Sequence, residues 1–202
     1  MSNMKNLLDI SSQPLSEMTT SQPNLPDGIL ELLKERNGFF VFESALEVFP
    51  YGVSPLSYAI EEWNKVETWK NSYKELAPQG LAFAQDIFGN QFLISDVIIF
   101  FECETGELTY LCDTIDEWCG KILDNYNFLT GYKIAHDWQK KQGAIPFRSR
   151  LTPVIPFVLG GEYDIENLVA MESQRSMKLR ASLANQIKDL PDGSTVSYEV
   201  GS

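Results

Sequence analysis

Few residues of this sequence have the types and spacing that catalysis requires. His136 is the one histidine, so the chain offers a single candidate general base and no pair of histidines for a metal ion. It stands beside Asp137 in a stretch with helical periodicity, where a structural or surface histidine is the favoured interpretation. Glu61 and Glu62 are adjacent, and on a helix they would point about 100° apart, so we interpret them as a solvated face rather than a paired acid and base.

The cysteines do not suggest a metal or redox site either. Cys103, Cys112 and Cys119 are odd in number and lack the paired short spacing of structural zinc sites. We expect reduced, packed thiols. The sequence contains no serine nucleophile elbow, so it predicts a protein that is not an enzyme and has no cofactor. An enzyme built on Asp86, His136 or Glu162 is the disfavoured alternative.

Two glycines in "PFVLGGEYDIENL", residues 156–168, raise the possibility of a phosphate cradle. The segment has no lysine or third glycine, and the carboxylates of Glu162 and Asp164 would repel an anion. A turn explains more, because Gly160 and Gly161 permit backbone conformations barred to other residues and Asp164 can cap a helix that begins at Ile165. We therefore predict a strand-to-helix turn.

A second compact turn occurs at residues 86–90. Gly89 can supply a positive φ angle, and the Asp86 side chain can accept hydrogen bonds from the loop that also contains Asn90. The segment "FGN" is too short to hold a nucleotide. We interpret Asp86, Gly89 and Asn90 as a structural hairpin motif.

Composition limits the classes of partner. Sixteen basic and 28 acidic residues give a net charge of −12, which opposes binding to nucleic acid or to an anionic membrane and favours a basic partner. A purely solubilising acidic surface is the open alternative. The chain begins without the apolar run of a signal peptide and has no stretch of about 18 apolar residues, so we expect a cytoplasmic protein.

The elements of the N-terminal part are predicted from periodicity. Residues 1–27 are polar and lack an apolar period, so we expect a flexible tail and a single folded domain over residues 28–202. A short helix should run from Ile29 to Asn37. Residues 54–76 then predict two short helices whose aromatic side chains lie at the edge of the core; these side chains are Trp63, Trp69 and Tyr73.

The middle of the chain predicts an antiparallel meander. The apolar runs "LAFAQD", "NQFLI", "VIIFFEC" and "LTYLC" are separated by turn residues. A last hairpin turning on Thr105 and Gly106 would pair Cys103 with Leu108, Phe101 with Tyr110 and Ile99 with Cys112. Helices are then expected on both faces of this sheet.

The C-terminal half is predicted to be mostly helical. Thr114 and Glu117 have the spacing of a capping box, and a helix with an apolar stripe should continue to Gly131. Another helix is expected around residues 134–141, followed by a proline-broken segment, one or two helices over residues 164–189, and a final strand at Val196, Tyr198 and Val200. Helices before and after a meander indicate an α+β fold.

Several motifs together resemble a known family. They are "NGFFVFESALEVFP", "WNKVETWKNSY", "FAQDIFGNQF", "FECETGEL", "FLTGYKIAHDWQ", "PFVLGGEYDIENL" and "LPDG". In this order they resemble bacterial members of the SUKH superfamily, relatives of the fungal Smi/Knr cell-wall assembly regulator, over roughly residues 28–200. The resemblance implies an α+β domain with a central antiparallel sheet and no catalytic constellation. It also implies that Gly160, Gly161 and Asn167 belong to the scaffold.

The resemblance also implies a function. Many bacterial members look like immunity proteins that neutralise polymorphic or contact-dependent toxins, often nucleases, as in toxin–antitoxin pairs; others are regulatory or scaffolding modules that bind an endogenous protein. We expect protein binding to a basic toxin domain, with no nucleic acid or membrane partner and an undetermined oligomeric state. Five carboxylates around the last hairpin are the expected partner-binding residues, and they are Glu102, Glu104, Glu107, Asp113 and Asp116.

Overall fold

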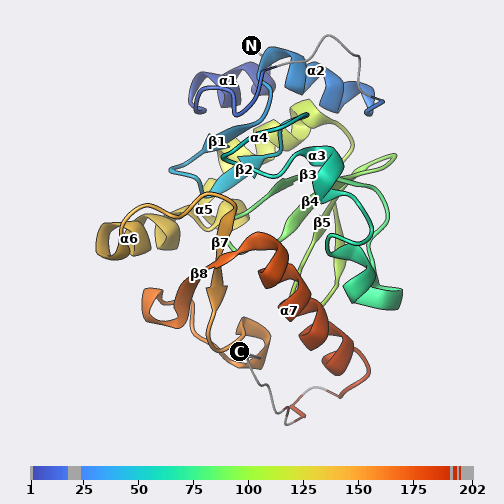
Figure 1. Cartoon of the computed structure of the whole chain (residues 1–202), viewed down its shortest axis with the longest axis vertical. Helices are drawn as coiled ribbons and strands as arrows, with labels where there is room; N and C mark the ends of the chain where they lie inside the picture. Colours follow the sequence, from blue (N-terminus) through green and yellow to red (C-terminus); the bar gives the residue numbers. More distant parts are fainter. Residues whose placement is uncertain (1, 18–23, 192, 195, 197–202) are drawn as a thin grey trace.

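The computed structural model describes residues 2–17, 24–191, 193, 194 and 196 of the chain. In this part, six strands form one antiparallel sheet in sequence order, so the sheet is a continuous meander (Figure 1). The strands are β1 (Phe39–Val41), β2 (Leu46–Val48), β3 (Leu81–Gln85), β4 (Gln91–Ile94), β5 (Ile98–Phe101) and β6 (Leu108–Cys112). A smaller two-stranded sheet pairs β7 (Ser149–Pro153) with β8 (Leu168–Glu172). The predicted α+β fold with a central antiparallel sheet is confirmed.

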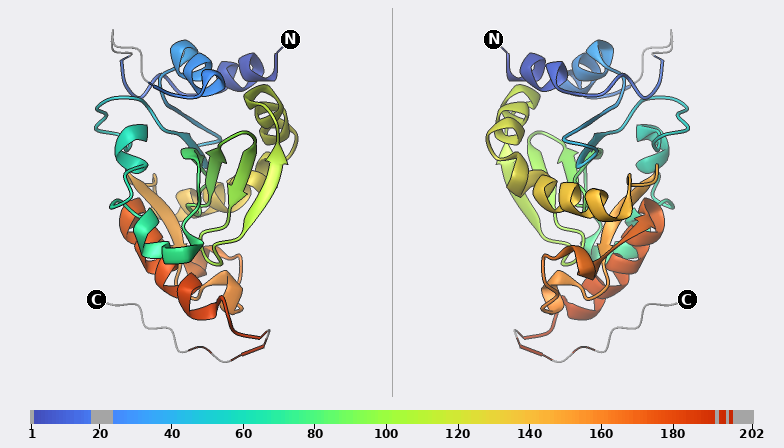
Figure 2. Two further views of the ribbon diagram at one scale, coloured as in Figure 1. Left: turned by 90° about the vertical axis from the view of Figure 1, so that its right-hand side faces the viewer. Right: turned by 90° about the vertical axis from the view of Figure 1, so that its left-hand side faces the viewer.

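Helices cover both faces of the central sheet, and α1 and α2 lie at the end of the molecule where the chain begins (Figure 2). The α-helices are α1 (Asn3–Asp9), α2 (Asp27–Glu35), α3 (Ile60–Trp63), α4 (Ile115–Asp124), α5 (Tyr126–Thr130), α6 (Tyr132–Gln142) and α7 (Ser173–Ile187). The described residues also contain three 3-10 helices, η1 (Lys70–Leu76), η2 (Phe157–Leu159) and η3 (Ile165–Asn167). No helix in the described residues is long and apolar enough to cross a membrane.

Aromatic side chains form the core on both faces of the sheet. On one face, Trp118 of α4 is fully buried and packs edge-on against Phe83 of β3 and Phe92 of β4. On the other face, Trp69 and Tyr73 pack against Phe101 of β5. Trp69 and Tyr73 are fully buried, as is Trp63, so the prediction that these three side chains lie at the edge of the core is wrong.

The N-terminal residues are part of the folded structure. Ser2 caps α1 by accepting a hydrogen bond from Lys5 N–H, α1 packs against α4, and Leu7, Leu8 and Leu15 are buried. The prediction of a flexible tail is therefore wrong for residues 2–17. The segment is polar on average and has no repeating apolar pattern, so its sequence does not indicate a folded structure. Burial of the three leucines nevertheless stabilises it.

The last hairpin differs from its predicted register by two residues. Phe101 pairs with Leu108 rather than Tyr110, and Ile99 pairs with Tyr110 rather than Cys112. The loop is wider than a two-residue turn, because Gly106 N–H donates to the Glu102 carbonyl (2.8 Å) and Glu102 N–H donates to the Glu107 carbonyl (2.9 Å). All three cysteines are free and buried, as expected.

The C-terminal part also differs from the prediction. The helix expected over residues 115–131 is two helices, α4 and α5, and the segment expected to be helical over residues 164–189 contains strand β8 before α7. Strand β7 lies in the proline-broken segment, where Pro153 is its last residue and pairs with Leu168. Most of the predicted final strand lies outside the described residues.

Candidate functional site

The carboxylates predicted to bind a partner lie in different environments. Glu107 is exposed at the start of β6, and Glu102 is half-buried and accepts a hydrogen bond from Thr105 Oγ1 (2.6 Å). Asp113 is exposed just after β6 and accepts a hydrogen bond from the Tyr110 hydroxyl (3.0 Å). Two exposed carboxylates, Glu107 and Asp113, therefore flank the two ends of β6.

Asp116 has a structural role. It accepts hydrogen bonds from Met4 N–H (3.0 Å), the Ser2 hydroxyl (2.8 Å) and Asn3 Nδ2 (3.2 Å). The bonds from Met4 and Ser2 lower the pKa of Asp116, since they stabilise its charged form. Asp116 thus anchors the beginning of α1 to α4, and its oxygens are already occupied.

Glu104 lies inside the protein, with 2% of its surface exposed. Its Oε2 accepts a hydrogen bond from Val158 N–H (3.0 Å), and its Oε1 lies 4.0 Å from Nε of the buried Arg180. Burial raises the pKa of Glu104, while Arg180 and the Val158 N–H oppose that shift. The expectation that Glu104 steers a partner from the surface is therefore wrong; it holds the β5–β6 loop against η2.

Arg180 of α7 was not singled out from the sequence, and it is the centre of this buried polar group. Its guanidinium donates to the carbonyls of Phe88 and Leu151 and lies 3.1 Å from the Cys103 sulfur. A Cβ at Gly89 would lie 3.2 Å from Arg180 Nη1, so glycine at this turn lets the guanidinium approach. Arg180 therefore joins α7 to the β3–β4 turn and to β7.

The β3–β4 turn has the predicted structural geometry. Asp86 accepts hydrogen bonds from Phe88 N–H (2.8 Å), Asn90 N–H (2.9 Å) and Asn90 Nδ2 (2.8 Å), and Gly89 has φ +85°. Burial raises the pKa of Asp86 to about 7, against the hydrogen bonds and Arg180, which favour the carboxylate. Asp86 is thus engaged by the loop and presents no oxygen to solvent.

The two-glycine segment is also structural, but it joins the 3-10 helices η2 and η3, so the prediction of a strand before this turn is wrong. Gly160 has φ +88°, and a Cβ at Gly161 would lie 1.9 Å from the Ile155 carbonyl oxygen. Asp164 accepts a hydrogen bond from Glu166 N–H and caps η3. Asn167 exchanges two hydrogen bonds with the backbone of Ile155, so its side chain braces the loop.

The structure brings these two turn motifs together through aromatic rings. Phe157 and Tyr163 stack with their ring centroids 3.8 Å apart, and Phe88 packs edge-on against both. The turn at Asp86 and the loop at Gly160 and Gly161 thus form one scaffold.

The remaining candidate chemistry is not assembled into a catalytic set. Within the described residues, His136 Nδ1 hydrogen-bonds only to Glu43 Oε2 (2.7 Å), at the surface. Burial raises the pKa of Cys112 to about 11 and that of Cys119 to about 12, and it raises the pKa of Cys103 further, so all three thiols stay protonated at neutral pH. The described part of the chain contains no cluster of three or more metal-ligating side chains.

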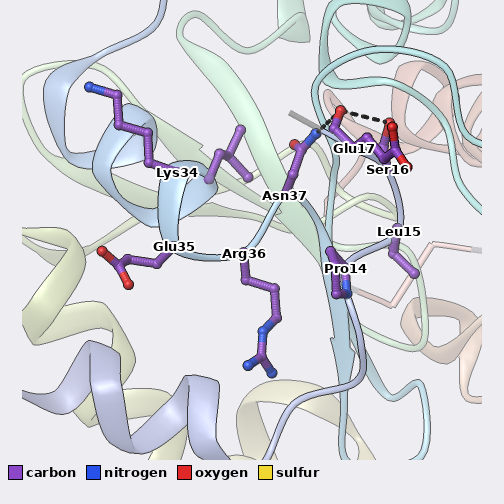
Figure 3. A pocket seen from close by; sticks show the side chains of 9 residues that line it. Pro14, Leu15, Ser16, Glu17, Lys34, Glu35, Arg36 and Asn37 are labelled. Carbon is purple, nitrogen blue, oxygen red and sulfur yellow. Dashed lines mark hydrogen bonds between the residues drawn. The ribbon is translucent and has the colours of Figure 1, made fainter. Parts of the chain in front are cut away.

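A pocket of about 450 Å³ lies between the N-terminal segment and the end of α2 (Figure 3). Asn37 donates from Nδ2 to the carbonyls of Glu17 and Tyr51, and its Oδ1 accepts from Tyr51 N–H. The charged side chains of Lys34, Glu35 and Arg36 point in different directions in Figure 3 rather than toward one centre. The pocket therefore marks a joint between two segments and brings no reacting groups together.

Strand β6 is the accessible part of the central sheet. It is the last strand of the meander, so among the described residues one of its two backbone edges has no neighbouring strand (Figure 2, left view). Leu108 and Tyr110 are 52% and 60% exposed, and Glu107 and Asp113 flank them. An apolar strand with a free edge and carboxylates at both ends can bind a protein segment.

A second set of exposed apolar side chains lies in and around the loop between β7 and β8. Its members are Phe147, Val154, Ile155, Val158, Tyr163 and Val169. This surface offers side chains but few free backbone groups, since Asn167 binds Ile155 and the Val154 N–H donates to the Asn167 carbonyl.

Residues 22–121 match the model of the SMI1/KNR4 family (SUKH-1), and this part of the chain is a SUKH-1 domain. The match begins before α2 and ends within α4, so it includes the whole six-stranded meander. It confirms the suspected SUKH relationship over this range.

The fold also occurs in a solved structure. The crystal structure of Atu4351 from Agrobacterium tumefaciens superposes with a TM-score of 0.58 at 13% sequence identity, and the similarity covers 88% of this chain and 87% of that one. The shared architecture therefore extends beyond the residues of the family match, to the C-terminal elements. No curated protein matches the chain.

Proposed function

We propose that this chain is a non-enzymatic protein-binding domain that acts as an immunity protein in the cytoplasm. Its partner would be a polymorphic or contact-dependent bacterial toxin, a class that includes many nucleases. The SUKH-1 domain is the observation that carries the proposal, because the bacterial proteins that these motifs resemble look like immunity proteins. The net charge of −12 supports a basic partner, since opposite charge accelerates encounter.

The organisation of the ionisable groups supports binding rather than catalysis. The most strongly desolvated of them, such as Glu47, Asp86, Arg150 and Arg180, are tied to one another or to the backbone. Glu47 pairs with Arg150 and accepts from Gln85 Nε2 (2.7 Å), which joins the small sheet to the large one. Perturbed groups in this protein therefore stabilise the scaffold, whereas catalytic groups lie in clefts open to a substrate.

Growth rescue tests the proposal. Each toxin encoded beside the gene for this chain is expressed in a bacterial host, with and without the chain, and growth is followed. We expect one such toxin to arrest growth and the chain to restore it. As a control, Arg180→Ala should abolish rescue through loss of folding, whereas the exposed Glu31→Gln should leave it intact. Arrest that the chain never relieves would refute the immunity role.

A regulatory or scaffolding module that binds an endogenous protein is the second candidate. The family match favours it as well, since the family bears the names of the fungal SMI1 and KNR4 proteins. In that case, deletion of the gene should cause a growth or cell-envelope phenotype in a strain that lacks every neighbouring toxin. An immunity protein would be dispensable in that strain.

A further inference from the structure

We propose that the free edge of β6 receives an extended, lysine- or arginine-bearing segment of the partner protein, which adds to the central sheet as a further strand. This inference rests on the proposed protein-binding function and names the surface and the mode of binding. In such strand addition, main-chain hydrogen bonds hold the segment and alternate side chains select it.

The backbone of β6 has the donors and acceptors that this mode requires. Glu102 N–H donates to the Glu107 carbonyl, and the register then pairs Phe101 with Leu108, Phe100 with Thr109 and Ile99 with Tyr110. Hydrogen-bonded and non-hydrogen-bonded pairs alternate along an antiparallel ladder. Thr109 therefore bonds inward to β5, while Leu108 and Tyr110 direct their N–H and C=O groups toward the free edge.

The side chains around this edge favour a basic segment with apolar residues. Leu108 and Tyr110 are more than half exposed and offer contacts to apolar side chains. Glu107 at one end of β6 and Asp113 and Glu117 at the other are exposed carboxylates that can pair with lysine or arginine. Lys121, one turn after Glu117 on α4, offsets part of the negative charge at this end of β6.

A second copy of this chain fits the same edge poorly. Antiparallel pairing of two β6 strands around Tyr110 would place Glu107 of each copy opposite Asp113 of the other. Both ends of the interface would then juxtapose like charges, which disfavours the pair. The charge pattern thus admits a basic strand and opposes self-association.

Backbone amide exchange by NMR tests the proposal directly. The probe is a short peptide of alternating lysine and valine, added to the full chain at about ten times its Kd. The amides of Leu108 and Tyr110 should exchange about tenfold more slowly when the peptide is bound, as mass action requires for a protected bound state. The Thr109 amide, already bonded to β5, is the internal reference and should change little.

Three controls separate strand addition from other contacts. The same peptide N-methylated at every residue has no main-chain donor for the ladder and should give no protection, and a peptide of alternating glutamate and valine should bind at least about tenfold more weakly. Replacing Glu107→Gln together with Asp113→Asn should weaken the lysine peptide about fivefold at low salt, whereas Glu31→Gln with Glu67→Gln, two exposed carboxylates on α2 and in the loop after α3, should not.

Other results would overturn the inference. The first two are failure of the lysine peptide to bind and binding that leaves the amides of Leu108 and Tyr110 unprotected. The third is slower exchange of these amides, without peptide, as the concentration of the chain is raised, which would identify a second copy as the occupant. The growth assay distinguishes the two proposals. Rescue from a toxin without protection at β6 would refute only the edge, and protection by the peptide without any rescue would refute only the immunity role.

Discussion

The two edges of the central sheet carry similar backbone groups and have different surroundings. The β1 edge is covered by residues 12–16 of the same chain, whereas the β6 edge has no neighbouring strand in the described structure. An uncovered edge invites pairing with another chain, so proteins normally block it. The difference is the one that the proposed strand addition requires, with one edge closed within the chain and the other accessible to a partner.

The β1 edge is closed by several independent contacts. Ser12 N–H donates to the Phe40 carbonyl (2.8 Å), and Phe40 N–H donates to Ser12 Oγ (3.0 Å). Further along, Leu15 N–H donates to the Gly38 carbonyl (2.9 Å), and the Leu15 side chain is buried. One nitrogen of Arg36 then lies within 3.2 Å of three backbone carbonyls, those of Leu8, Ser11 and Ser12.

The β6 edge is instead protected from nonspecific pairing by charge. Glu107 and Asp113 lie at its ends, and exposed charges on edge strands disfavour association with neutral or acidic strands. A basic strand escapes this restriction. Both edge strands carry backbone groups that could pair with another chain. Residues 12–16 cover these groups on β1, whereas the carboxylates beside β6 limit which strands can pair with it.

Removal of the cover should produce the largest effect. A chain that begins at residue 24 loses three buried leucines, Leu7, Leu8 and Leu15. Its free energy of unfolding should therefore be lower by roughly 5 kcal/mol. Its β1 edge would also be free, so size-exclusion chromatography should show new oligomers. Urea unfolding measures the first effect. The exposed Lys5→Gln in α1 should leave the midpoint unchanged, and an unchanged midpoint for the truncated chain would break the comparison.

The sequence allowed the central meander and its helices to be predicted, because those segments carry local signals. Thr114 caps α4 by accepting from Glu117 N–H, and the buried stripe of α4 includes Trp118 and Ile122, as the periodicity indicates. Turn residues such as Gly89 likewise occur where a positive φ is required. These features depend on neighbours in sequence.

The features that were missed depend on long-range contacts. The N-terminal cover is stabilised by contacts with Arg36 and Asn37, which are 28 and 20 residues from their partners Leu8 and Glu17, and nothing in its own composition signals them. The burial of Glu104 depends on Arg180, which is 76 positions later in the chain. The sequence predicts a helix where β8 lies, because pairing with β7, and not the propensity of the segment itself, determines its conformation. The pairing register of β6 depends on the width of the β5–β6 loop. The sequence did not indicate that width, so it did not show which residues of β6 direct their backbone groups toward the free edge.

Leu15→Ala should have the second largest effect. The side chain is buried beside the β1 edge, and its truncation should lower the free energy of unfolding by about 2–3 kcal/mol through lost contacts and a residual cavity. Chemical denaturation followed by tryptophan fluorescence gives the value. Gln13→Ala, two residues earlier and exposed, is the matched control. Equal stability of the two variants would show that residues 12–16 do not close the edge in solution.

Arg36→Met should have a smaller effect, about 1–2 kcal/mol, because the half-buried carbonyls that lose their donor can be partly solvated. Arg36→Lys keeps the charge but not the planar guanidinium, so its thermal midpoint should fall between those of Arg36→Met and the unchanged chain. A wild-type midpoint for Arg36→Met would mean that the hydrogen bonds of Ser12 and Leu15 hold the segment alone.

The smallest effect is expected at the open edge, and it is the sharpest test of the comparison. Leu108 is 52% exposed, so Leu108→Ala should change the free energy of unfolding by no more than about 0.5 kcal/mol, against the larger loss expected for the same substitution at Leu15. Both variants remove the same atoms from a leucine next to a sheet edge. If Leu108→Ala were as destabilising as Leu15→Ala, β6 would be covered in solution, and a melting temperature that rises with protein concentration would identify a second copy as the cover. If the loss stays small and the melting temperature is independent of concentration, the exposed leucine contributes nothing to the folded monomer, and its place beside two outward-facing backbone positions is left for a partner to use.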